Sequence, residues 1–120
     1  MAENMWQALY ERLGRRICLA GDTARTDFTA IGRRGAIDVM AVPIGAYNPW
    51  IVSHCTPEQA VEMANEARAR FVIPIHHQTF RLGREPMDEP IERFRRAIEP
   101  ERVALLDIGE TFVLNSPRVA

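Results

Sequence analysis

The sequence has 120 residues, enough for one domain with a core but few for a layered α/β enzyme. A hydrophobic content of 47% and a charged content of 26% are typical of a soluble globular protein. The net charge of −1 gives no sign of nucleic acid or an anionic membrane as a partner. All fifteen basic residues are arginines, which excludes a lysine Schiff base and a P-loop lysine.

The two cysteines, Cys18 and Cys55, are too few for a disulfide framework and indicate a reducing compartment. Cys18 stands in an apolar run and is expected to be a small buried hydrophobe. Cys55 beside His54 could be a thiolate ligand, although one such pair is a weak signal. No signal peptide is recognisable and no apolar run approaches the ~20 residues of a membrane span. We therefore expect no membrane span and a cytoplasmic location.

The first quarter of the chain predicts short elements. Residues 3–13 carry apolar side chains at the spacing of a helix. Residues 16–20 predict a strand that ends in a tight turn at 21–23. Residues 26–33 predict a short helix with Thr26 as its cap.

The middle of the chain predicts a strand, a loop and a helix. Residues 36–44 are apolar throughout, which indicates a strand buried on both faces. A loop with Gly, Pro and aromatic residues follows at 45–55. The helix expected at 57–69 is the best marked, because Thr56 and Gln59 can form a capping box around a first-turn proline. Its apolar face comprises Ala60, Val61, Ala64 and Ala67.

The last third predicts a strand at 71–75, a long loop at 79–90 and a helix that begins near Pro90. Residues 103–108 and 111–114 predict two short strands joined as a hairpin. Strands that alternate with helices indicate an α/β layer fold.

Asp22 is the first candidate for chemistry. It follows an apolar strand directly, and Gly21 allows the backbone to turn tightly there. One interpretation is a metal ligand at the strand end, where α/β sheets place their chemistry. The other is a carboxylate that caps the next helix or closes an Asx-turn, and the local sequence slightly favours it.

His76 and His77 directly follow the strand predicted at 71–75. Neighbouring residues of a strand point to opposite faces, so one ring can ligate a metal while the other packs or donates a hydrogen bond. Thr79 could bond to an imidazole nitrogen. From local sequence, a metal ligand and a structural histidine have about equal weight here.

His54 ends the loop directly before a predicted helix, whose positive end favours a neutral imidazole. Such a ring suits a metal ligand or a general base, and a structural loop residue explains it as well. All three histidines nevertheless fall in loops after strands. Glu58, Glu62 and Glu66 recur at i, i+4 and i+8, which predicts a solvated helix face rather than catalytic carboxylates.

Four sequence blocks carry a resemblance to a known family, and they are 18-CLAGDT-23, 38-DVMAVPIGAYNP-49, 54-HCTPEQAVEMA-64 and 75-IHHQTFRLGREPMDEP-90. Residues 15–114 resemble the C-terminal half of metallo-β-lactamase-fold hydrolases. The branch that they resemble most includes N-acyl-phosphatidylethanolamine-hydrolysing phospholipase D and L-ascorbate-6-phosphate lactonase. The resemblance implies an α/β fold, half of a four-layer αββα sandwich, with a mixed sheet and helices packed on one face. Residues 1–120 would then be a single partial domain with a frayed tail at 115–120.

By that resemblance Asp22 is the carboxylate that bridges two metal ions, and His76 is the last histidine ligand. His54 is a histidine at the active-site mouth that acts in substrate handling or catalysis. The implied reaction is attack of a metal-bound hydroxide on an ester, lactone, amide or phosphodiester. The implied cofactor is a divalent metal, up to two ions, with zinc as first choice and manganese or iron as alternatives. The substrate groove would be lined by Tyr47, Trp50 and His77.

The sequence lacks the family's His-x-His-x-Asp-His signature and the histidine that normally precedes the strand before Asp22. Two ligands are too few for a dinuclear centre in a monomer. We therefore expect either a fragment of a hydrolase, inactive without an N-terminal companion that carries the signature, or a homodimeric half-domain without chemistry. The first alternative implies a small-molecule or phospholipid-like ester or lactone as substrate. The resemblance also makes residues 5–12 a strand that pairs with 16–20, which we prefer to the helical spacing.

Overall fold

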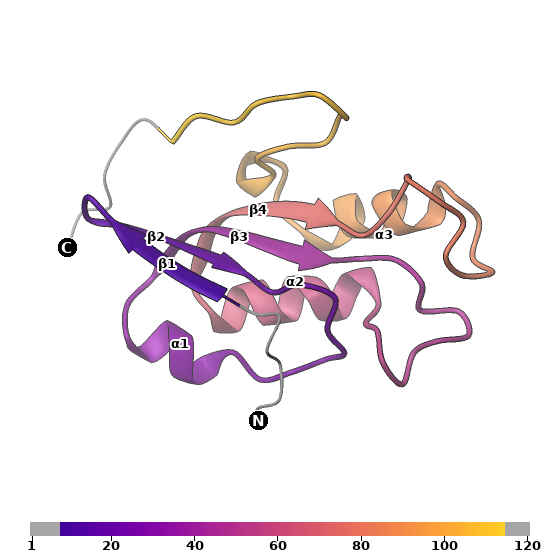
Figure 1. The fold of residues 1–120 in the computed structure, drawn as a ribbon, viewed down its shortest axis with the longest axis horizontal. Helices are drawn as coiled ribbons and strands as arrows, with labels where there is room; N and C mark the ends of the chain where they lie inside the picture. The colour runs from indigo at the N-terminus through magenta and orange to yellow at the C-terminus, as the bar shows by residue number, and fades with distance from the viewer. Residues whose placement is uncertain (1–7, 115–120) are drawn as a thin grey trace.

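The computed structural model describes residues 8–114. Over this range the chain forms a four-stranded mixed sheet with the order β1-β2-β3-β4. β1 and β2 are antiparallel, whereas β2, β3 and β4 run parallel. The C-terminal ends of the parallel strands therefore meet at one edge of the sheet (Figure 1). The strands are β1 (Ala8–Arg12), β2 (Arg15–Leu19), β3 (Ile37–Pro43) and β4 (Ala69–Ile75).

The N-terminal segment forms a strand, as the resemblance implied, and not a helix. β1 pairs with β2 across the two-residue turn Leu13-Gly14, in which both residues have positive φ (53° and 73°). Such a turn matches the twist of a β-hairpin. Pairing with β2 thus outweighs the helical spacing of 3–13. The residues before Ala8 lie outside the described range.

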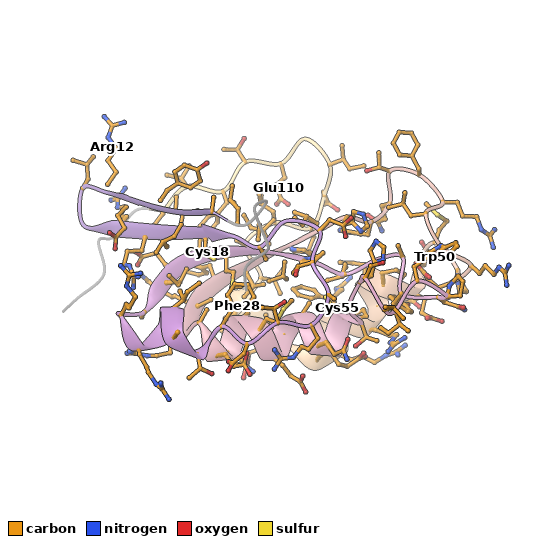
Figure 2. All side chains as sticks on the ribbon, turned by 60° about the horizontal axis from the view of Figure 1, so that its bottom comes forward. Arg12, Cys18, Phe28, Trp50, Cys55 and Glu110 are labelled. Atoms are coloured by element: carbon orange, nitrogen blue, oxygen red, sulfur yellow. The ribbon has the colours of Figure 1, made fainter. Side chains whose placement is uncertain are left out.

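Three α-helices lie on one face of the sheet (Figures 1 and 2). They are α1 (Thr29–Arg33), α2 (Pro57–Glu66) and α3 (Glu89–Ala97), followed by a short 3₁₀ helix, η1 (Pro100–Arg102). The predicted capping box of α2 is confirmed: Thr56 Oγ1 accepts the Gln59 N–H at 3.2 Å, and the Gln59 side chain accepts the Thr56 N–H at 2.9 Å. α2 ends at Glu66, short of the expected residue 69, and the left-handed φ of 57° at Arg68 turns the chain into β4, which begins at Ala69. None of these helices has the length and apolar composition needed to cross a bilayer.

The core lies between the sheet and the helices. The four residues predicted as the apolar face of α2 are all buried, which confirms that prediction. All seven residues of β3 are buried, as expected for a strand covered on both faces. Figure 2 places Cys18, Phe28 and Cys55 in this interior. Other core side chains are Met40, Val42, Met63, Val72, Phe94 and Ile98.

The opposite face of the sheet is apolar and only partly covered. Segment 103–114 runs beside β4 (Figure 1), and Ala104 donates its N–H to the Val72 carbonyl at 3.0 Å. The rings of Phe112 and Phe71 pack there with centroids 5.0 Å apart. Ile17 on this face remains 39% exposed. The face therefore offers apolar area to a further layer.

The prediction of a hairpin at 103–108 and 111–114 is wrong. Segment 103–114 makes a single bridge, between Val103 and Val72, and no strand pairing of its own. The physical reason is a local turn, in which Glu110 Oε1 accepts the N–H groups of Leu106 and Asp107 at 3.1 Å each. These donors are therefore not available to a ladder. The expected tail at 115–120 lies outside the described residues.

The start expected for the first helix is also wrong. α1 begins at Thr29 rather than at residue 26, and Thr26 does not cap it. Asp27 Oδ1 instead accepts the Thr29 N–H at 2.9 Å, and Glu66 Oε1 accepts the Phe28 N–H at 3.0 Å. The segment before α1 is thus held by Asp27 within the segment and by Glu66 of α2.

Candidate metal centre

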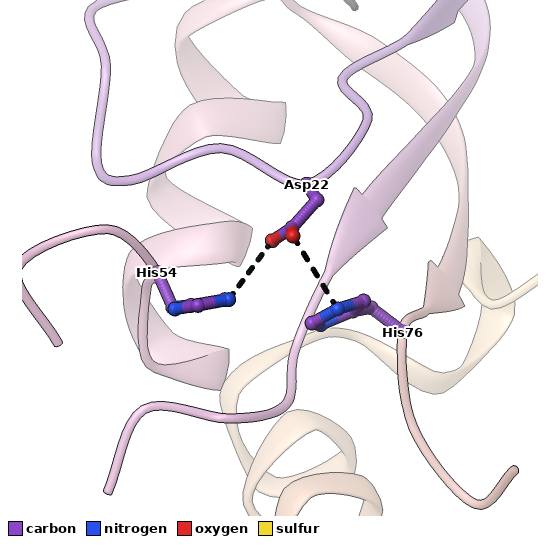
Figure 3. A group of neighbouring side chains, drawn as sticks. All are labelled: Asp22, His54 and His76. Carbon is purple, nitrogen blue, oxygen red and sulfur yellow. Dashed lines mark ion pairs between the residues drawn. The ribbon is translucent and has the colours of Figure 1, made fainter. Parts of the chain in front are cut away.

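Asp22, His54 and His76 meet at the C-terminal edge of the parallel strands (Figure 3). Nε2 of His54 lies 3.2 Å from Oδ1 of Asp22, and Nε2 of His76 lies 3.5 Å from Oδ2. One potential ligand atom from each residue lies within 4.8 Å of the others. Among residues 8–114, these three form the one group of His, Cys, Asp and Glu side chains with the spacing of a metal site.

Left-handed backbone conformations end the strands at this site. Gly21 has a φ of 70° and reverses the chain directly before Asp22. His76 has a φ of 65°, which ends the regular alternation of β4 and turns the ring toward Asp22 (Figure 3). Gly45, after β3, packs so closely on the His76 carbonyl oxygen that a Cβ there would overlap it. The backbone of the loop after β3 therefore supports His76 directly.

The hydrogen bond of His54 determines which ring nitrogen faces Asp22. Nδ1 lies 2.9 Å from the Trp50 carbonyl oxygen and 3.2 Å from the Ser53 hydroxyl. Because a carbonyl oxygen only accepts, the tautomer that bonds to Trp50 carries its hydrogen on Nδ1. In the neutral ring Nε2 is then an acceptor that faces the carboxylate. Two acceptors 3.2 Å apart repel each other unless a proton or a metal cation lies between them.

His76 adds a second nitrogen to the same carboxylate. Its Nδ1 is buried without a hydrogen-bond partner in the described chain, so Nε2 makes the polar contact of this ring. Its ring stacks on that of His54, with centroids 5.4 Å apart and an interplanar angle of 17°. Bonds of ~2.1 Å in tetrahedral zinc place ligand atoms about 3.4 Å apart. The separations of 3.2 and 3.5 Å fit that geometry.

The residues predicted for a substrate groove do not join this group. His77 is half-buried, and burial lowers its pKa against a smaller opposing effect of a hydrogen bond with the Pro74 backbone. Tyr47 is buried, and its hydroxyl donates to a Glu89 carboxylate oxygen. Trp50 is exposed on the loop that carries His54. Their role in binding substrate stays a prediction.

Cys55 is not placed as a metal ligand. Its thiol donates to the Pro43 carbonyl at 3.3 Å, and burial raises its pKa to about 12. A buried protonated thiol is a poor ligand. Cys18 is buried, as expected.

The glutamates of α2 also lie outside the site. Glu58 pairs with Arg93 at 2.6 Å, whereas Glu62 and Glu66 pair with Arg25 at 3.1 and 2.6 Å. These contacts agree with the expected role of a charged helix face rather than of catalytic carboxylates. Arg25 and Glu66 also anchor the segment after Asp22 on α2.

Sequence patterns did not indicate the role of Glu85. This carboxylate is only 6% exposed, and it accepts the N–H groups of Ala46 at 2.7 Å and Asn48 at 3.0 Å. It joins the loop after β4 to the loop after β3, next to His76. The one available signal was an acidic residue between Arg84 and Pro86, inside the fourth block of the resemblance.

Comparison with known proteins agrees with this geometry. The sequence pattern of the Lactamase_B_2 family, the beta-lactamase superfamily domain, matches residues 8–77. The chain is 36% identical over 118 residues to N-acyl-phosphatidylethanolamine-hydrolyzing phospholipase D 1 of Caenorhabditis elegans, covering 88% of this chain and 33% of that protein. It is 38% identical over 102 residues to a UPF0173 metal-dependent hydrolase of Deinococcus radiodurans, covering 82% of this chain and 40% of that protein.

A solved structure of a metallo hydrolase has a similar fold. Igni18, a metallo hydrolase of Ignicoccus hospitalis, superposes with a TM-score of 0.65 at 26% identity, covering 87% of this chain and 43% of that one. This chain therefore belongs to the beta-lactamase superfamily domain family, a family of metal-dependent hydrolases with the metallo-β-lactamase fold. The chain spans well under half the length of each of these three relatives.

Proposed function

We propose that this chain supplies one half of the active site of a metal-dependent hydrolase. Asp22 and His76 would hold a divalent metal, with zinc as first choice, and His54 would act in substrate handling or catalysis. The convergence of the three side chains, with ligand atoms within 4.8 Å of one another, carries the proposal. Nε2 of His76 and Oδ2 of Asp22 lie 3.5 Å apart, close to the ~3.4 Å between two ligand atoms of a tetrahedral zinc ion, which supports a cation between these two side chains.

A divalent metal bound there would activate water and polarise the scissile carbonyl or phosphoryl group. The residues of the chain prepare the site for it. Asp22 directs one oxygen to each histidine, so a single carboxylate orients both rings. The bond from His54 Nδ1 to the Trp50 carbonyl leaves Nε2 able to accept a proton or a hydrogen bond at the site. Asp22 is 51% exposed, which leaves this side of the site open to a substrate.

We infer that the site is completed by a second polypeptide segment. A catalytic zinc takes three protein ligands and a water, and a pair of ions takes more. The missing ligands would come from a companion segment with the His-x-His-x-Asp-His signature or from a second copy of this chain. The sheet face opposite the helices supports such a layer, because it contains a groove of about 440 Å³. The groove is lined mainly by apolar side chains, including Ile17, Val39, Ile73, Leu105 and Phe112.

The second candidate function is a non-catalytic half-domain that dimerises. The same apolar face favours it, since a second copy could cover the face without any chemistry. Under the first candidate function alone, the substrate of the whole hydrolase would be a small-molecule or phospholipid-like ester or lactone.

The test measures metal content per chain together with the mass of the protein in solution. We expect about one or two ions per chain in the completed assembly. Asp22→Ala and His76→Ala should abolish binding, whereas His54→Ala should retain the metal and lose only turnover. Glu92→Ala, at an exposed position on α3, is the matched control and should bind metal normally.

The outcomes separate the two candidates. A folded dimer that binds no metal would contradict the hydrolase proposal and support the non-catalytic half-domain. Metal loss in His54→Ala as complete as in His76→Ala would instead make His54 a ligand and remove its separate role.

A further inference from the structure

Two loops form an exposed apolar end of the molecule, which we call the tip surface and define as residues 48–53 and 79–84. Both loops extend beyond the C-terminal ends of β3 and β4 (Figure 1). They are joined by the backbone, because the Arg84 N–H donates to the Asn48 carbonyl at 2.6 Å. Glu85, the next residue, accepts the Asn48 N–H at 3.0 Å. The two loops therefore form one continuous surface.

Large apolar side chains are concentrated at the tip surface. Trp50 is 55% exposed, Val52 is 91% exposed and Phe80 is 71% exposed, and Ile51 and Leu82 are exposed beside them. Figure 2 places Trp50 at this end of the molecule. Exposed apolar residues scattered singly need no explanation, but five of them on two joined loops favour an interaction site.

The charge of the tip surface has one sign. Arg81 and Arg84 are exposed, and neither guanidinium pairs with a carboxylate within residues 8–114. The two loops contain no Asp or Glu. Glu85 is buried, and its oxygens are bound to backbone N–H groups. A net charge of −1 for the whole chain therefore conceals a basic and apolar end.

We propose that the tip surface docks on an anionic lipid surface. Trp50 and Phe80 would enter the interfacial region of the bilayer, where amphipathic aromatic rings are favoured. Arg81 and Arg84 would face the anionic headgroups while their aliphatic stems cover apolar area. The sheet face remains free for a companion layer in this orientation, because the loops project past the strand ends and not from the face (Figure 1).

This docking would bring the candidate metal centre close to the lipid. His54 is tied to the tip surface by its bond to the Trp50 carbonyl at 2.9 Å, and His76 precedes the second loop by three residues. Docking itself needs neither a metal nor hydrolysis, so it can hold or fail independently of the proposed function.

The experiment measures binding of the full chain to two kinds of vesicle, pure phosphatidylcholine and an equimolar mixture of phosphatidylcholine and phosphatidylserine. A Trp6→Phe background leaves Trp50 as the one indole, so its fluorescence reports insertion. We expect a blue shift and co-sedimentation with the mixed vesicles, and much weaker binding to the neutral ones. The Arg81→Ala and Arg84→Ala changes should each weaken binding about fivefold. Phe80→Ser should weaken it about tenfold.

Matched controls lie at the other end of the molecule. Arg33→Ala with Arg34→Ala removes two positive charges, twice the loss in either single tip variant, from exposed positions at the end of α1. Leu13→Ser with Val113→Ser removes comparable exposed apolar area. Neither pair should change binding, and circular dichroism would show that every variant folds.

Two results would overturn the proposal. The first is a folded wild-type chain that binds neither kind of vesicle. That result would also be expected if the tip surface were a contact site for another protein instead of a lipid. The second is binding that survives the tip variants and is lost with Leu13→Ser and Val113→Ser, because another face would then contact the lipid.

Discussion

Glu85 reaches across two loops to Ala46, whose backbone N–H it accepts at 2.7 Å, although the residues lie far apart in the chain. Its second oxygen accepts the Asn48 N–H at 3.0 Å. Ala46 has a left-handed φ of 68°, and its neighbour Gly45 packs directly on the His76 carbonyl. One buried carboxylate therefore holds the loop that supports the candidate ligand His76.

Removing this carboxylate should destabilise the fold. Glu85→Ala leaves two backbone N–H groups without their charged acceptor, and we expect a loss of about 3 kcal/mol in the free energy of unfolding. Urea denaturation measures the change. Glu92→Ala, on the exposed side of α3, should stay within about 0.5 kcal/mol of wild type. Equal stabilities of the two variants would show that Glu85 does not hold the loop.

Gly45 offers a second test of the same support. Gly45→Ala places a methyl group against the His76 carbonyl oxygen, where two backbone segments leave no space. We expect destabilisation by about 3 kcal/mol from overpacking, together with weaker metal binding because His76 is displaced. Denaturation and metal titration measure the two effects.

Gly14→Ala is the control for that variant. Gly14 has a positive φ of 73°, which Gly45 does not share, and nothing lies within 4 Å of the added methyl group. Backbone strain alone should cost about 1 kcal/mol there. Normal metal binding in Gly45→Ala would contradict the direct support of His76 by this loop.

Local patterns in the sequence predicted the elements whose causes are local. The capping box of Thr56 and Gln59 acts within four residues, and the buried β3 shows its character in an unbroken apolar run. The start of α1 could not be predicted in this way, because Glu66 accepts the Phe28 N–H from 38 positions away. The error in the hairpin after η1 has a local cause instead, because Glu110 takes the N–H groups of Leu106 and Asp107 in a turn that the apolar pattern of these residues did not indicate.

The candidate site was also only partly predictable from local sequence. Asp22 alone favoured a cap or turn slightly over a ligand, and only the four blocks of family resemblance joined it to His54 and His76. The structure then brings the three side chains together. Glu85 escaped prediction because a buried carboxylate in a polar loop has no local pattern, and its partners lie in another loop.

The ion pairs of α2 predict how stability depends on pH. The hydrogen bond from Arg25 lowers the pKa of Glu66, and the hydrogen bond from Arg93 lowers the pKa of Glu58. Because each pKa is lower in the folded chain, the unfolded chain binds more protons in acid. The stabilisation is therefore present above the ordinary glutamate pKa of 4.5 and is lost as pH falls through the lower folded value.

Urea denaturation between about pH 6 and pH 3 tests this dependence. We expect the free energy of unfolding to fall across the acid range in wild type and to fall less in Glu66→Gln. Glu92→Gln, whose carboxylate is exposed on α3, should follow the wild-type curve. An identical acid slope in wild type and Glu66→Gln would show that the pair with Arg25 does not contribute.

The two cysteines should be unreactive in the folded chain. Burial raises the pKa of Cys18 to about 11 and that of Cys55 to about 12, so little thiolate exists near neutral pH. Thiol-specific labelling at about pH 8 should be slow in the native protein and fast in urea. The Cys18→Ala variant isolates Cys55 for this measurement. Fast native labelling of Cys55 would mean that its thiol does not stay bound to the Pro43 carbonyl, and would restore it as a candidate ligand beside His54.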